Sequence, residues 1–159
     1  MLMRAYIIIL ILGLSLLSGC NSSNNNTYLF EGNSMQPTIS DQDKLLVDET
    51  YYEDNEVKTG DIIIFKYGND SFHIKRVLGL PGELIQIKNG KLLVNRKPVN
   101  PVFVFNDIHA DETMEEGLTL KQDEYFVIGD NPGSSKDSRH DGPLTEEMII
   151  GKVLKKEAK

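Results

Sequence analysis

The chain has 159 residues, 40% of them hydrophobic, which suits one folded domain with its own core. Its formal net charge of -7 argues against nucleic acid as a partner, because that partner requires a basic surface. The only cysteine is Cys20, so an internal disulfide is excluded. The three histidines lack the spacing of metal ligands, and we expect neither a metal nor another cofactor.

The first 20 residues predict a signal or anchor segment. Arg4 precedes an apolar run over residues 5–17, which is close to a signal-peptide core and shorter than the ~20 residues of a membrane span. The run ends in Leu-Ser-Gly-Cys, which resembles the lipobox of bacterial lipoproteins and would make Cys20 a lipid anchor. The alternative is an uncleaved membrane anchor. Either way, we expect the domain on the outer face of the cytoplasmic membrane.

The segment after Cys20 is rich in asparagine and serine. Residues 21–29 are therefore expected to form a flexible polar tether, and residues 30–159 to form the catalytic domain.

The pattern beyond the tether is mostly that of β-strands. An Asn-Gly pair between two alternating runs predicts a hairpin over residues 83–97, because a tight type I′ turn needs positive φ at both central positions. An acidic segment, residues 107–117, is expected to be an exposed loop. The fold class is therefore all-β or β-rich, with little helix. Further strands are expected at residues 44–47, 62–67, 71–80 and 123–130, and a helical turn followed by a strand at residues 145–156.

One serine stands out in the turn-rich stretch GNSMQPTIS, residues 32–40. A serine hydroxyl needs a nearby base to act as a nucleophile, although it can also simply cap a turn. His73 and Lys75 are two residues apart on one expected strand, so both would point to the same face. Lys75 could act only if burial keeps its amine uncharged, since free lysine is almost wholly protonated at neutral pH. Sequence geometry leaves both bases open.

A second polar stretch, GDNPGSSKDSRHDG at residues 129–142, is typical of a solvated loop. It also holds aspartate and arginine residues that could rigidify the loop as a bidentate ion pair.

Four motifs occur in order: GNSMQPT, GDIIIF, KRVLGLPGE and GDNPGSSKDSR. Together they resemble the successive boxes of bacterial type I signal peptidases, of the Gram-positive kind, and the resemblance covers residues 30–153. The family has a fold of antiparallel β-sheets with a β-hairpin insertion. It also has a serine–lysine dyad, which implies that Ser34 is the nucleophile and Lys75 the general base. His73 would then be a strand neighbour.

The resemblance also implies supporting roles in the last motif. Ser135 matches a serine that hydrogen-bonds the lysine, and Asp137 and Arg139 match a structural ion pair. Asp130 and Asn131 match the turn that precedes them.

Three residues are expected at the substrate: Met35, Gly32 and Ile74. Met35 matches a residue that helps line the substrate pocket. Gly32 stands where some relatives have a serine that holds the oxyanion, so backbone amides, including that of Ser34, would have to do so here.

The implied function is a membrane-bound endopeptidase. It would remove signal peptides from secreted preproteins through an acyl-enzyme, after the substrate pairs with exposed strand edges. Two alternatives stay open: an inactive relative that binds signal-peptide regions, and a dedicated peptidase for one protein such as a pilin or conjugation protein.

Overall fold

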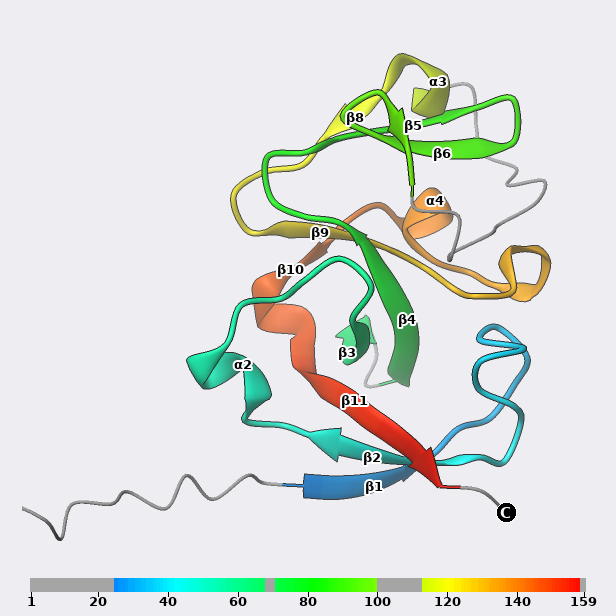
Figure 1. Ribbon diagram of the computed structural model, residues 1–159, viewed down its shortest axis with the longest axis vertical. Coiled ribbons are helices and arrows are strands. Elements are labelled where there is room, and N and C mark those ends of the chain that lie inside the picture. Colours follow the sequence, from blue (N-terminus) through cyan, green and yellow to red (C-terminus); the bar gives the residue numbers. More distant parts are fainter. Residues whose placement is uncertain (1–24, 68–70, 100–112, 158–159) are drawn as a thin grey trace, which may run out of the picture.

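The computed structural model describes residues 25–67, 71–99 and 113–157 (Figure 1). The expected anchor segment, including Cys20, and the first part of the acidic segment lie outside these residues. Among the described residues, no helix combines the length and the apolar character needed to cross a membrane.

A seven-stranded sheet forms the larger part of the fold. Its strand order is β1-β2-β11-β3-β4-β9-β10, and every pairing is antiparallel. Neighbours in this sheet are often far apart in sequence, since β11 at the end of the chain inserts between β2 and β3. The strands are β1 Asn25–Leu29, β2 Lys44–Asp48, β3 Ile62–Tyr67, β4 Ser71–Gly79, β9 Glu124–Ile128, β10 Leu144–Thr145 and β11 Ile149–Glu157.

A smaller antiparallel sheet, with strand order β7-β6-β5-β8, lies at the other end of the molecule (Figure 1). The predicted hairpin is confirmed: β5 Leu84–Lys88 pairs with β6 Lys91–Val94. Asn89 and Gly90 have φ of 52° and 70°, the positive values that the tight turn requires. The edge strands are β7 Lys97–Pro98 and β8 Leu118–Thr119.

The described helices are all short, as expected for a β-rich domain. The predicted helical turn before the last strand is confirmed as η3, Glu146–Met148, which leads into β11. The others are α2 Tyr51–Asp54, α3 Thr113–Glu116, η2 Pro132–Ser134 and α4 Ser138–Asp141.

Two expectations need correction. The tether predicted over residues 21–29 is strand from Asn25 onward, because the backbone of β1 pairs with β2 whatever its side chains. The acidic segment was expected to be exposed throughout, but its last part forms α3. There Met114 is only 7% exposed, because it packs into an apolar cluster with Ile87 and Leu92.

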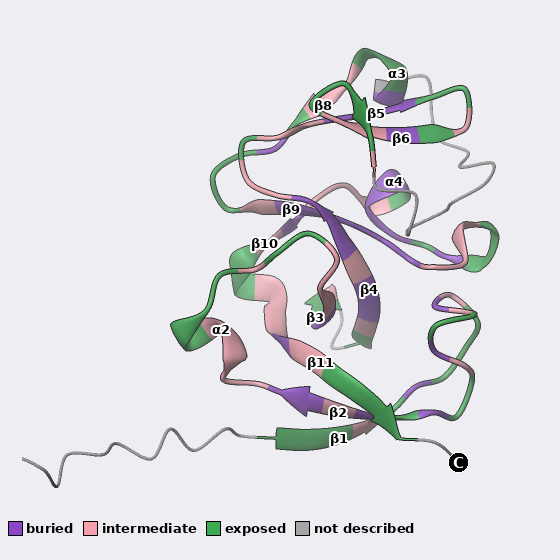
Figure 2. Cartoon of the chain, viewed as in Figure 1, coloured by how far each residue is buried: buried purple, intermediate pink, exposed green. Residues whose placement is uncertain are grey.

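The described residues form three apolar clusters in the core, and buried residues run through both sheets (Figure 2). One of them lies beneath the loop that joins β1 to β2. Met35 and Ile39 of that loop pack there against Leu45 on β2 and Ile74 on β4. The core therefore fixes the loop that carries Ser34 against the strand that carries Lys75.

Candidate active site

Ser34 lies in a loop whose ends are tied together. Phe30 donates its backbone N–H to the carbonyl of Asp43 at 2.9 Å, and Gln42 donates to the carbonyl of Phe30 at 2.8 Å. Gly32 has a φ of 115°, a conformation that side chains disfavour, which explains a glycine at this position. With the fully buried Met35 as an anchor next to it, Ser34 is held in one place.

Lys75 reaches Ser34 from the middle of β4. Its side-chain Nζ lies 3.0 Å from Ser34 Oγ and also donates to the backbone carbonyl of Ile74 at 3.0 Å. The two site residues are 41 positions apart in sequence. Lys75 is only 4% exposed, although it is a residue type that usually lies in solvent.

Burial lowers the pKa of Lys75 from its ordinary value of 10.5, because an ammonium ion loses its hydration there. The negative charge of Asp137 acts in the opposite direction and raises it. An amine with a lowered pKa can be neutral at moderate pH, and a neutral amine can accept a proton from a hydroxyl.

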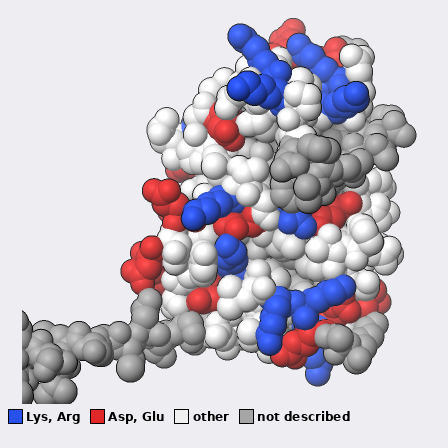
Figure 3. Space-filling model, viewed as in Figure 1, with Lys and Arg blue, Asp and Glu red and all other residues white. Residues whose placement is uncertain are grey.

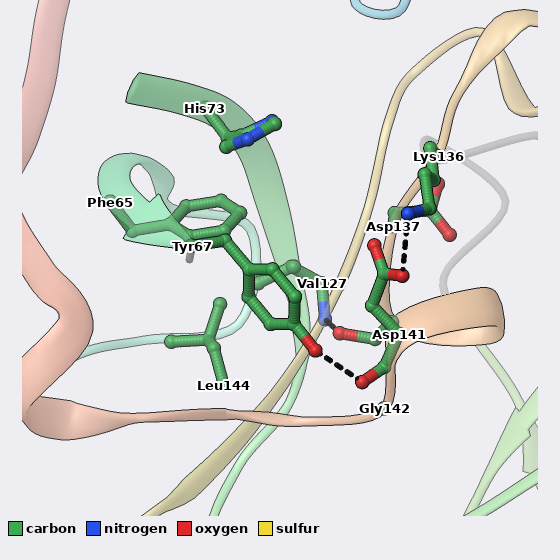
Figure 4. A pocket seen from close by; sticks show the side chains of 10 residues that line it. Phe65, Tyr67, His73, Val127, Lys136, Asp137, Asp141, Gly142 and Leu144 are labelled. Carbon is green, nitrogen blue, oxygen red and sulfur yellow. Dashed lines mark hydrogen bonds and ion pairs between the residues drawn. The ribbon is translucent and has the colours of Figure 1, made fainter. Parts of the chain in front are cut away.

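His73 lies on the same strand but has another environment. Its ring stacks on Phe65 with a centroid distance of 5.7 Å. Burial and the nearby Lys75 lower its pKa. Figure 4 shows the ring at a small cavity with Tyr67 and Leu144 below it. Within the described part of the chain no hydrogen bond joins His73 to Ser34, whereas Lys75 contacts the Ser34 hydroxyl.

Asp137 and Arg139 form a buried bidentate ion pair. The guanidinium Nε and Nη2 lie 2.7 and 2.9 Å from the two carboxylate oxygens. Both side chains are almost fully buried: that of Arg139 is 3% exposed and that of Asp137 0%. Arg139 also donates to the carbonyls of Pro132 and Ser135, and Asp137 accepts from the backbone N–H of Gly129. The pair therefore gives the loop over residues 129–139 one fixed shape.

The same loop also contacts the backbone at Ser34. Asn131 donates its backbone N–H to the carbonyl of Ser34 at 2.9 Å, and its side chain donates to the carbonyl of Asn33 at 3.1 Å. Gly129 permits this contact, because a Cβ there would lie 2.4 Å from the Ser34 carbonyl oxygen.

Asp130 binds Arg76, a partnership that the sequence analysis missed. The Arg76 side chain is only 12% exposed, although arginine usually lies in solvent, and its Nη2 lies 2.6 Å from the Asp130 carboxylate. An arginine inside an apolar strand needs a carboxylate, and this requirement was the available signal. The sequence does not say which aspartate meets it.

Ser135 differs from its expected role. It is 7% exposed and lies on the same loop, but its Oγ has no hydrogen-bond partner among the described residues. The expected bond to Lys75 is not formed, since Lys75 donates to Ser34 and Ile74.

A groove of about 450 Å³ opens beside the two site residues. Ile74 lines it as expected, whereas Met35 and Gly32 are not among its lining residues. Met35 is fully buried beneath the loop, and the backbone N–H of Gly32 is bound by the carboxylate of Asp41 at 2.8 Å. The walls come from β1 and β4 and include Tyr28, Leu29, Phe30, Phe72 and His73.

A serine hydroxyl beside a buried amine, on an antiparallel β scaffold with an open groove, is the arrangement of a serine hydrolase. The family model described as "Signal peptidase, peptidase S26" matches residues 2–155. The chain therefore belongs to the signal peptidase family S26, and its enzymatic class is signal peptidase I, a serine peptidase.

Individual relatives agree. Signal peptidase I V of Bacillus subtilis is 36% identical over 137 residues, which cover 79% of this chain and 82% of the relative. Signal peptidase IB of Staphylococcus aureus is 31% identical over 141 residues, covering 79% and 74%. The crystal structure of a signal peptidase I from Enterococcus faecalis superposes with a TM-score of 0.53 at 27% identity, covering 64% of this chain and 98% of that one.

Proposed function

We propose that the protein cleaves signal peptides from secreted preproteins at a membrane surface, with Ser34 as nucleophile and Lys75 as general base. The observation that carries the proposal is the 3.0 Å contact between Lys75 Nζ and Ser34 Oγ, made by a lysine that is only 4% exposed. Neither half of this observation would suffice alone. A distant amine could not take the proton, and an exposed amine would be charged at neutral pH.

The chemistry proceeds in two steps. Lys75 accepts the hydroxyl proton while Ser34 Oγ bonds to the scissile carbonyl carbon, and the lysine then gives this proton to the departing amine. Lys75 then takes a proton from the water that attacks the acyl carbon, and passes this proton to Ser34 Oγ as its bond to the acyl group breaks. The backbone N–H of Ser34 donates no hydrogen bond among the described residues, and it is therefore a candidate donor to the oxyanion.

The substrate binds in extended form in the groove. Support comes from its walls, which are the end of β1 and the first half of β4. An extended peptide between two strands gains main-chain hydrogen bonds that depend little on its sequence. Ile64 and Ile74 form an apolar surface beside Ser34, which suits a small uncharged residue before the cleaved bond.

Membrane association is the last part of the proposal. Leu29 and Phe72, at 52% and 51% exposure, are large apolar side chains at the wall of the same groove. Apolar side chains at the mouth of a groove favour contact with a lipid surface. The N-terminal segment adds an anchor, either through a lipid on Cys20 or through residues 5–20.

The test uses the full chain in detergent or vesicles and a preprotein substrate. Ser34→Ala and Lys75→Ala should each abolish cleavage while circular dichroism shows a folded domain. His73→Ala is the matched control on the same strand and should retain cleavage. If Lys75→Ala cleaved and His73→Ala did not, the base would be His73 and the proposal would be wrong.

The anchor is tested separately. Mass spectrometry of the purified N-terminus should show a lipid on Cys20, and Cys20→Ala should remove it. An intact, unmodified N-terminus would favour the uncleaved anchor and leave the chemistry unaffected.

A further inference from the structure

A second groove lies away from Ser34, between α2, the turn after β4 and η3. Its volume is about 510 Å³, and it shares no lining residue with the active-site groove. In Figure 1, α2 lies on the left of the molecule, whereas the loop that joins β1 to β2 lies on the right. The second groove is therefore separate from the active-site groove.

Carboxylates dominate the rim of this groove. Four of them line it and no lysine or arginine does, and Figure 3 shows acidic side chains on this edge of the molecule. Among the described residues, no group of three or more His, Cys, Asp or Glu is arranged to hold a metal ion. The charges suit a ligand with several spaced positive charges better than a single ion. They belong to Glu53, Asp54, Glu56 and Glu146.

The walls between the carboxylates are aromatic and apolar. Tyr52 and Tyr125 contribute rings, and ring faces attract ammonium and guanidinium groups. Val57, Leu80 and Pro81 contribute apolar surface, against which the methylene stem of a lysine or arginine can pack. The lining thus matches both parts of a long basic side chain.

Tyr125 adds a hydrogen-bond donor to the lining of the groove. It lines the groove and is only 8% exposed, yet its hydroxyl has no hydrogen-bond partner among the described residues. The hydroxyl of Tyr52, in contrast, donates to Asp61 at 3.0 Å. Burial raises the pKa of Tyr125, and Glu146 and Glu56 raise it further, so the phenol stays neutral. The Tyr125 hydroxyl reaches the surface of the groove, where it can donate a hydrogen bond to a bound ligand.

We propose that this groove binds a segment of another protein that carries lysine and arginine residues between apolar ones, in extended form. Charge complementarity selects the basic residues, and the aromatic and apolar walls select their stems and neighbours. The proposal goes beyond signal-peptide cleavage, because it gives the enzyme a docking site for a partner on a different face.

The probe is a fluorescein-labelled heptapeptide in which lysine and arginine alternate with leucine, and fluorescence anisotropy measures its affinity in salt of about 0.15 M. The double variant Glu56→Gln/Glu146→Gln should weaken binding about tenfold through the loss of charge-assisted contacts. The control, Glu115→Gln/Glu116→Gln on α3, changes the net charge equally and should weaken it by less than about twofold.

Two further variants complete the design. Tyr125→Phe removes only the hydroxyl and should weaken binding about threefold. Ser34→Ala should bind the peptide like the wild type while cleaving no preprotein, which separates this proposal from the catalytic one.

Two outcomes would overturn the proposal. Equal weakening by both double variants would show non-specific attraction to an acidic protein. A wild-type dimer in analytical ultracentrifugation that dissociates in Glu56→Gln/Glu146→Gln would show that a second copy of this chain occupies the groove.

Discussion

Arg76 holds Asp130 by two hydrogen bonds, from Nε at 2.8 Å and from Nη2 at 2.6 Å. Each partner is next in sequence to a residue of the site. Arg76 follows Lys75, which contacts the Ser34 hydroxyl, and Asp130 precedes Asn131, which binds the Ser34 carbonyl. The ion pair therefore closes a ring of contacts that fixes the amine relative to the hydroxyl.

Weakening this pair should loosen the site. Arg76→Lys keeps the positive charge but loses the two-pronged contact, so we expect a stability loss of about 1–2 kcal/mol. The rate constant kcat should fall more than KM rises, because the substitution disturbs the alignment of Ser34 and Lys75 and leaves the lining of the groove unchanged. Urea denaturation and steady-state kinetics measure the two effects.

The matched control is an exposed ion pair elsewhere. Lys121→Ala removes a partner of Glu124, and since Lys121 is 78% exposed, the change should stay within about 0.5 kcal/mol with full activity. Equal effects of the two substitutions would contradict a positioning role for Arg76.

Gly129 should be indispensable for activity. A Cβ there would lie 2.3 Å from Ser135 Oγ and 2.4 Å from the Ser34 carbonyl oxygen, so Gly129→Ala must displace one of them. We expect a loss of about 100-fold in kcat, since a displacement of about 1 Å at a reacting group has this effect. Gly133→Ala on the same loop is the control, because a Cβ there meets nothing within 4 Å. Comparable activity in both variants would sink the prediction.

The pH dependence of catalysis should reflect the buried amine. Only neutral Lys75 can accept a proton, so kcat/KM should rise with pH through the pKa of Lys75. Burial lowers this pKa, and the rise should therefore lie below 10.5. A pH profile with a peptide substrate measures it. An inflection at or above 10.5 would mean that Lys75 is not desolvated in solution.

Stability should depend on the same group. The pKa of Lys75 is lower in the folded state than in the unfolded chain, so the unfolded chain binds the proton more tightly. Protonation of Lys75 therefore lowers the free energy of unfolding, and this loss shrinks as the pH rises towards 10.5. Lys75→Met removes the effect. Its gain in unfolding free energy over the wild type should be largest at neutral and acidic pH and shrink by pH 10. Urea denaturation across this range tests the sign, and a gain that grows with pH would refute it.

Ser135→Ala separates stability from function. The Ser135 hydroxyl is buried without a partner, so its removal should leave the unfolding free energy unchanged or raise it. If the hydroxyl orients Lys75 once substrate is bound, kcat should nevertheless fall, by about tenfold for the loss of one such contact. Unchanged kcat would show that Ser135 only fills space.

Local patterns predicted much of the fold because their causes are local. The Asn89-Gly90 turn follows from the positive φ values that these two residue types accept, and the run from Ile62 to Tyr67 is a strand because β-branched and aromatic side chains favour one. Strand β1 escaped prediction because its residues, from Asn25 onward, are mostly polar. Its backbone pairs with that of β2, and such pairing leaves no signal in the pattern of side chains along the sequence.

The order of motifs by itself determined which residue types are available for the chemistry: a serine in a turn, a lysine in a strand, and aspartates and arginines in a loop. The family resemblance paired Lys75 with Ser34 and Arg139 with Asp137, and the structure brings both pairs into contact. Only the tertiary structure decided that Arg76 pairs with Asp130 and that Met35 is buried beneath the loop instead of lying in the groove. The physical reason is that contact and desolvation depend on how distant segments pack, and both are properties of the folded chain rather than of any one stretch of it.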